Sequence, residues 1–136
     1  MQKFLKTSSL AYAAGNVGAV VNSLAAWLFG MLGISAALGV KMAPPLTVGW
    51  LYPRLVWGGL WGFLFLLPFL PRSPLLRGLL FSIGPTLGQL FIVFPFGLGK
   101  GMLGLGLGTL TPILVILFNA IWGLVASYWL ERVQDE

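Results

Sequence analysis

The sequence predicts an all-α integral membrane protein, in which four transmembrane helices form a compact bundle. Of its 136 residues, 58% are hydrophobic and 8% are charged, whereas a soluble domain carries about 25% charged residues. Such a chain lacks the polar side chains that would cover a surface in water, so we expect lipid to be its solvent. Its length is that of one domain, residues 1–136.

Four apolar segments mark the expected helices, at roughly residues 9–38, 53–70, 74–97 and 109–130. Pro53 suits the first position of the second helix, because its missing N–H would be unpaired there in any case. Pro85 falls inside the third segment and predicts a kink, because it removes one backbone hydrogen bond. Pro112 falls in the first turn of the fourth helix.

A glycine-rich stretch, "GLGKGMLGLGLG" at residues 97–108, separates the third and fourth segments. It contains "GKGMLG", which satisfies the G-x-G-x-x-G pattern. A dinucleotide site would also need a preceding strand and an acidic residue about twenty positions later. Residues 119–124 read "NAIWGL", without an acid. We therefore expect a flexible or re-entrant turn here.

The net charge of +5 comes from eight cations that punctuate the apolar segments. This placement favours anionic lipid headgroups as partners, and no nucleic acid is expected. The positive-inside rule weighs the two sides against each other and favours cytoplasmic termini in a bacterial-type inner membrane. The side of the termini would hold Lys3, Lys6, Arg72, Arg77 and Arg132, and the opposite side Lys41, Arg54 and Lys100.

Small residues recur every four positions along the first helix. Two such ladders lie on adjacent stripes of one face, and they comprise Ala14, Gly18, Asn22, Ala26 and Gly30 beside Ala11, Gly15, Ala19 and Ser23. This spacing lets another helix approach backbone to backbone. We predict a close helix–helix contact, whose partner is the chain's own third or fourth helix, a second copy or another membrane protein.

Arg54 is a lone cation in the apolar stretch "WLYPRLVWGG". If Pro53 begins the helix, Arg54 lies near the membrane interface and serves as an anchor that reaches water or a lipid headgroup. Trp50 or Trp57 would then offer a cation–π contact. The alternative is a clamp for an anion or a planar partner. An anchor predicts that Arg54→Lys is nearly silent, which we favour, and a clamp predicts that lysine fails.

Three polar residues of the third segment, Ser82, Thr86 and Gln89, fall on one helical face beside Pro85. Polar groups at membrane depth belong in the bundle interior or in a wet cavity. One interpretation is that they hydrogen-bond to the carbonyl that Pro85 frees. The other is that they line a solute site.

Groups for catalysis are scarce. The chain has no His and no Cys, and its acids are confined to the C-terminal tail at Glu131, Asp135 and Glu136. General acid–base chemistry and metal sites need such groups, so we expect neither an enzyme nor a cofactor. Two hypotheses remain. The protein is a non-catalytic accessory or assembly subunit, or a homo-oligomer, that acts through helix association; alternatively it is an oligomeric channel or carrier for a small anion or neutral solute.

Overall fold

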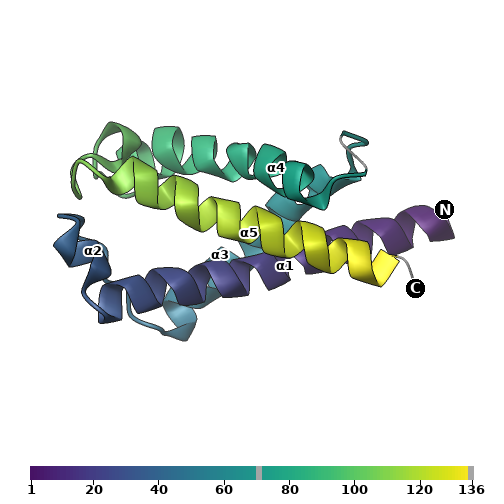
Figure 1. The fold of residues 1–136 in the computed structure, drawn as a ribbon, viewed down its shortest axis with the longest axis horizontal. Coiled ribbons are helices and arrows are strands. Elements are labelled where there is room, and N and C mark those ends of the chain that lie inside the picture. The colour runs from purple at the N-terminus through teal and green to yellow at the C-terminus, as the bar shows by residue number, and fades with distance from the viewer. Residues whose placement is uncertain (70–71, 135–136) are drawn as a thin grey trace.

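The computed structural model describes residues 1–69 and 72–134, and within these ranges the chain is all-helical and has no β-strand. The long helices lie lengthwise beside one another, and the two termini lie at the same end (Figure 1). In chain order the elements are α1 (Gln2–Met31), α2 (Ile34–Ala37), α3 (Val48–Gly62), the 3₁₀ turn η1 (Phe63–Leu66), α4 (Pro74–Gly88), the π-helical segment η2 (Gln89–Gly97), the 3₁₀ turn η3 (Met102–Gly104) and α5 (Thr111–Gln134).

Three helical stretches among the described residues are long and apolar enough to cross a membrane, which supports the membrane class that the composition predicted. They are Gln2–Met31, Pro74–Gly97 and Thr111–Gln134. The second predicted segment is shorter as an α-helix, at 15 residues, and continues for four residues as η1. Together these 19 residues extend about 30 Å, at about 1.5 Å per α residue and about 2.0 Å per 3₁₀ residue.

The predicted bounds of the first helix need correction. It was expected at residues 9–38, but α1 begins at Gln2 and ends at Met31. The end comes where Gly33 adopts a left-handed conformation, with φ of 77°. That conformation is open to glycine and closes the helix. The start comes earlier because Lys and Ser residues of the first turns do not prevent helix formation.

Pro53 does not begin its helix, contrary to the expectation. The helix starts five residues earlier at Val48, where the Thr47 side chain accepts a hydrogen bond from the Trp50 backbone N–H at 3.3 Å. Thr is a favoured residue at this capping position, so the sequence did contain the true start signal. Pro53 and Arg54 therefore lie in the second turn of α3.

The third segment has the bounds that the sequence predicted, but its winding changes within it. Regular α-helix runs through Pro85 to Gly88, and η2 continues it in a π winding that contains Pro95. The Leu98 N–H donates to the Val93 carbonyl at 2.8 Å, five residues back. The predicted kink at Pro85 stays a prediction. The fourth helix spans Thr111–Gln134, against the expected 109–130.

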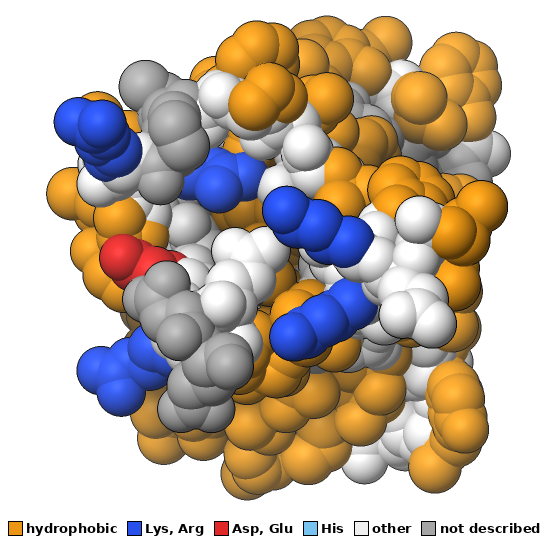
Figure 2. Space-filling model, turned by 90° about the vertical axis from the view of Figure 1, so that its right-hand side faces the viewer, with side chains coloured by type: hydrophobic (Ala, Val, Ile, Leu, Met, Phe, Trp, Pro, Cys, Tyr) orange, Lys and Arg blue, Asp and Glu red, His pale blue; other side chains and the backbone are white. Residues whose placement is uncertain are grey.

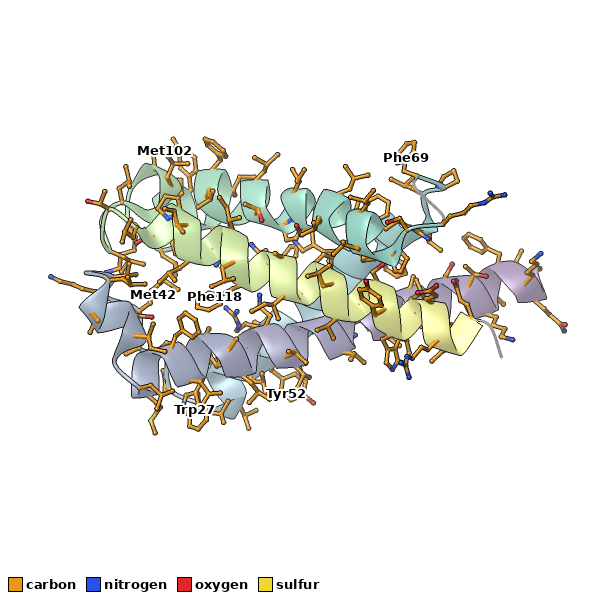
Figure 3. The ribbon with its side chains drawn as sticks, viewed as in Figure 1. Trp27, Met42, Tyr52, Phe69, Met102 and Phe118 are labelled. Atoms are coloured by element: carbon orange, nitrogen blue, oxygen red, sulfur yellow. The ribbon has the colours of Figure 1, made fainter. Side chains whose placement is uncertain are left out.

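The helices pack through α1 and α5, which touch each other along their length and each hold one further helix. α3 packs on α1, and α4 packs on α5. Phe118 of α5 points toward α1 (Figure 3), where its ring meets Phe29 edge-on at a centroid distance of 5.0 Å. The labelled Trp27, Tyr52 and Phe69 point outward in the same view. This arrangement leaves α3 and α4 as neighbours with little direct packing between them.

The glycine-rich stretch forms a compact loop, in agreement with the predicted turn. Gly99, Gly101, Gly104 and Gly108 have positive φ angles, and Leu103 adopts the same region at φ of 62°. The loop packs on the segment after α2, where the Lys41 N–H donates to the Leu107 carbonyl at 2.9 Å. Val40 beside it is 1% exposed. The two connections therefore close the end of the bundle opposite the termini.

Candidate functional site

The small-residue ladders of α1 face the interior of the helix bundle. Their members from Ala11 to Ala26 are buried, while Gly30 at the end is partly exposed. A Cβ added to Gly18 would lie 2.5 Å from the Trp122 carbonyl oxygen of α5. A Cβ added to Gly58 of α3 would lie 2.5 Å from the Cβ of Ala19. One ladder thus faces α5 and the other faces α3.

These contacts bear on the association hypothesis. The sequence left open whether the ladders meet the chain's own third or fourth helix, a second copy or another protein. The helices that meet them belong to the fourth predicted segment, which was among the expected partners, and to the second, which was not. Because the chain's own helices occupy both small faces, these faces no longer argue for an external partner.

Arg54 points into the bundle and binds side chains of α1. Its Nε donates to the Ser23 hydroxyl at 2.9 Å, and one terminal nitrogen donates to the Asn22 amide oxygen at 2.5 Å. Its guanidinium also lies over the Trp50 ring, 4.7 Å from the centroid. Of the two tryptophans proposed for this contact, Trp57 does not make it and is 62% exposed. Arg54 is therefore held by a rigid three-sided set of contacts, which differs from an anchor that reaches toward water.

A chain of side-chain hydrogen bonds continues from Arg54 across the bundle. The Asn22 amide nitrogen donates to the Phe118 carbonyl oxygen of α5 at 2.6 Å, which turns the amide oxygen toward Arg54. Asn119 is the residue after Phe118 in α5, and its amide nitrogen donates to the Gln89 amide oxygen of η2 at 3.2 Å. These bonds join α3 to α1, α1 to α5, and α5 to η2, and leave the gap between α3 and α4 unbridged by side-chain hydrogen bonds among the described residues.

A cavity of about 430 Å³ lies between the helices that these hydrogen bonds join. Polar side chains reach it from every long helical stretch, namely Asn22 of α1, Arg54 of α3, Gln89 of η2 and Asn119 of α5. Its remaining lining is apolar and includes Trp57, Trp61 and Trp122. A concave, mostly apolar pocket with a few convergent polar groups is the usual form of a small-molecule site.

Only one of the three residues proposed to line a solute site, Gln89, lies in the cavity wall. The Ser82 hydroxyl donates to the Leu79 carbonyl at 2.7 Å, and the Thr86 hydroxyl donates to the Ser82 carbonyl at 2.7 Å. The carbonyl that Pro85 frees is that of Phe81, so the alternative interpretation does not describe these bonds either.

The closeness of α4 and α5 explains why Ser82 lies outside the cavity. A Cβ added to Gly78 would lie 2.7 Å from the Gly123 carbonyl oxygen, and a Cβ added to Gly123 would lie 3.1 Å from the Cβ of Ser82. The two helices are in backbone contact here, which leaves no space for a solute. The cavity begins further along α4 and into η2, where Pro85, Gly88 and Gln89 line it. Helical spacing identified the shared face but not the depth at which it opens.

The charge of the cavity is positive. No carboxylate pairs with Arg54 among residues 1–69 and 72–134, and the described acid, Glu131, lies in the last turns of α5. Asn119 lines the cavity twelve residues before Glu131, which places the carboxylate about 18 Å away along the helix axis. A cation in a low-dielectric interior is costly without a counter-charge, so the site favours an anion.

The described residues hold no cluster of His, Cys, Asp and Glu that could bind a metal ion. What the arrangement can do is donate hydrogen bonds. Two of the five N–H groups of Arg54 are used by Ser23 and Asn22 among the described residues. The Asn119–Gln89 pair uses one amide nitrogen and leaves the other NH₂ group free, whichever way the two amides are turned.

Sequence reasoning named Arg54 and Gln89 but missed Asn119 as a site residue. Asn22 was expected only as a member of a helix-packing ladder, and Asn119 was not expected to line a solute site. The signal was present, because an amide in the middle of an apolar helix marks a functional position by default. The role of Trp61 could not be found from sequence, because it depends on the depth at which α3 meets α4.

Comparisons of the chain with protein-family models, with curated proteins and with solved structures find no match.

Proposed function

We propose that this protein is a non-catalytic membrane protein that binds a small anion in the cavity between its helices and acts as its carrier. The observation that carries this proposal is Arg54. It lines an internal cavity without a paired carboxylate among the described residues, and free N–H donors accompany it. An anion would supply the missing charge and accept those hydrogen bonds. This is the second of the two functions that the sequence suggested, and a single chain already forms its site.

The membrane arrangement that goes with this function has four spans. The three long apolar stretches cross the bilayer, and α3 with η1 forms the fourth, because about 30 Å matches the hydrocarbon thickness. Arg54 is six residues past the start of α3, which places it about 9 Å along the helix axis from that end. At this depth a guanidinium is below the headgroups and needs partners from the protein or a ligand.

The basic end of the molecule supports cytoplasmic termini. Lys and Arg side chains gather on the face where the chain begins and α5 ends (Figure 2). That end carries Lys3, Lys6, Arg72, Arg77 and Arg132, whereas Lys41 and Lys100 lie in the connections at the other end. The positive-inside rule then places the termini in the cytoplasm and the Arg54 side of the cavity toward the outer leaflet.

Charge-selective labelling of a cysteine in the cavity tests the proposal. The chain has no native cysteine, so Val93→Cys, in the lining, would be the single reactive thiol. We expect an anionic methanethiosulfonate reagent to react faster than a cationic one of similar size. At a separation of about 10 Å between Arg54 and the charge of the reagent, and an effective dielectric constant of about 20, the interaction of two unit charges changes the labelling rate roughly tenfold.

Two variants supply the controls. Arg54→Gln should abolish the preference for the anionic reagent, whereas Arg132→Gln removes the same charge from an exposed site and should preserve it. Ile83→Cys, exposed on α4 and outside the cavity lining, should show no dependence on Arg54. Equal rates for the two reagents at Val93→Cys, with Arg54 intact, would contradict an anion site.

A further inference from the structure

We infer that the ligand is an amphipathic anion, with a carboxylate or phosphate group on an apolar chain, and that it enters the cavity from the bilayer between α3 and η2. This inference rests on the proposed anion site and adds the kind of molecule and its route. Three features of the cavity carry it, which are its mostly apolar wall and size, the distance between Arg54 and the ring that closes its deep end, and the position of its mouth.

The cavity is too large for a simple ion. Its volume of about 430 Å³ lies in the range of about 300–1,000 Å³ that drug-sized organic ligands occupy. Aromatic and aliphatic side chains supply most of the wall, and they include Trp57, Trp61, Ile92 and Val93. A hydrated inorganic anion would leave this apolar surface without a partner. A ligand with an apolar body would cover it and gain free energy for each buried CH₂ group.

Arg54 and the Trp61 ring lie at different depths of the cavity. Arg54 is about 9 Å along the axis from the start of α3, and Trp61 is seven residues further, about 10 Å deeper. The Trp61 ring closes the deep end, because it lies against Gly84 and Gly88 of α4, where an added Cβ would come within 3.2 Å and 3.1 Å of ring atoms. A charged head at Arg54 with its chain toward Trp61 has the orientation of a lipid in one leaflet.

The mouth of the cavity faces outward between α3 and η2. Trp57 of α3 and Ile92 of η2 both line the cavity and are 62% and 63% exposed. The side-chain hydrogen bonds among the described residues link the other helix pairs around the cavity, and none joins α3 to η2. The α3–η1 span is linked to α4 elsewhere, where Arg77 donates to the Phe65 carbonyl of η1 at 2.7 Å. In a bilayer, the exposed flank of a helix bundle meets lipid chains. An amphiphile can therefore pass sideways into the cavity without leaving the membrane.

A binding series in nanodiscs of phosphatidylcholine tests the inference. Radiolabelled decanoate is equilibrated with the wild-type protein and with Arg54→Gln, and their difference is the binding that depends on Arg54. Partition into the lipid is the same in both samples and cancels. We expect Arg54→Gln to bind decanoate at least about tenfold more weakly, because a charge-assisted hydrogen bond is lost. Arg132→Gln should bind as the wild type does.

Competitors separate the possible ligands. Unlabelled decanoate should displace the label, acetate should fail at the same concentration, and decanol should fail because it lacks the charge. Each CH₂ group buried in the cavity should lower the dissociation constant about fourfold, when that constant is expressed against the free anion in water. Displacement by dioleoyl phosphatidate would assign the source as a membrane lipid, and its failure would assign it as a single-chain acid. Both results support an amphipathic anion.

A substitution at the mouth keeps the test independent of Arg54. Ile92→Trp places a bulkier side chain on the rim, and Ile83→Trp makes the same change at an exposed site of α4 that does not line the cavity. We expect Ile92→Trp alone to slow or weaken decanoate binding. Equal displacement by acetate and decanoate would overturn the inference and leave the anion site standing. Failure of every anion to bind in an Arg54-dependent way would overturn both.

Discussion

Gly18 offers the sharpest test of the contact between α1 and α5. In Gly18→Ala, the new Cβ would lie 2.5 Å from the Trp122 carbonyl oxygen and 2.9 Å from the Trp122 Cδ1. A carbonyl oxygen within a helix cannot move aside alone, so the helices must separate. Overpacking of this kind costs about 1–3 kcal/mol, and the better helix propensity of Ala returns up to about 1 kcal/mol. We expect a net loss of about 0.5–2 kcal/mol.

Gly49→Ala is the matched control, because Gly49 also lies in a helix and an added Cβ there meets nothing within 4 Å. This variant should be neutral or more stable by up to about 1 kcal/mol. Reversible unfolding in mixed micelles of sodium dodecyl sulfate and dodecyl maltoside, followed by circular dichroism, measures both free energies. If Gly18→Ala were as stable as Gly49→Ala, α1 and α5 would not lie in backbone contact at this point.

Three further predictions concern the site and the loops. Arg54→Lys should lower the free energy of unfolding by about 1 kcal/mol or more, because lysine cannot keep both the Asn22 and Ser23 bonds and stay over the Trp50 ring; a silent lysine in the same micelle assay would support the anchor instead. Gly104→Ala should cost about 1–3 kcal/mol more than Gly33→Ala, since both have positive φ but only Gly104 would place a Cβ 2.8 Å from Thr111; equal melting temperatures would contradict the packing of the loop. Gln89→Cys should react with a small methanethiosulfonate reagent while Ser82→Cys stays protected, because of these two residues only Gln89 lines the cavity. Mass spectrometry measures both reactions, and a faster reaction at Ser82→Cys would contradict the placement of the cavity.

The broad class of this protein was predictable because it follows from composition. Few charged residues among long apolar stretches predict helices in lipid, and the bounds of the third segment were correct at 74–97. The small-residue spacing in α1 indicated a close approach, and the ladder residues from Ala11 to Ala26 are indeed buried. Periodicity reports which face of a helix packs, so this much is available from a single sequence.

The errors arose where a choice between two local signals depends on the rest of the chain. Pro53 is a good first residue of a helix, but Thr47 is a good cap, and the cap marks the true start. The error placed Arg54 in the first turn of the helix and made an anchor at the membrane interface the favoured interpretation.

The partners of Arg54 could not be predicted, because they come from residues about thirty positions earlier in the chain. From the sequence we expected water, a lipid headgroup, a tryptophan face, an anion or a planar partner. The tryptophan face is that of Trp50, and the hydrogen bonds to other side chains go to Asn22 and Ser23, which were not expected. Which helices become neighbours is a property of the whole bundle, and the cavity lies where α3 and η2 are apart, beyond the contact of Trp61 with α4.

The most direct test of the anion site is a crystal structure of the protein grown in a lipid mesophase with 10-bromodecanoate. Anomalous scattering locates the bromine atom, and the electron density locates the carboxylate. The account predicts the carboxylate within hydrogen-bond distance of the Arg54 guanidinium and the bromine in the cavity toward Trp61. Bromine bound only on the outer surface of the helices, with the cavity free of ligand and Arg54 still bonded to Asn22, would contradict it.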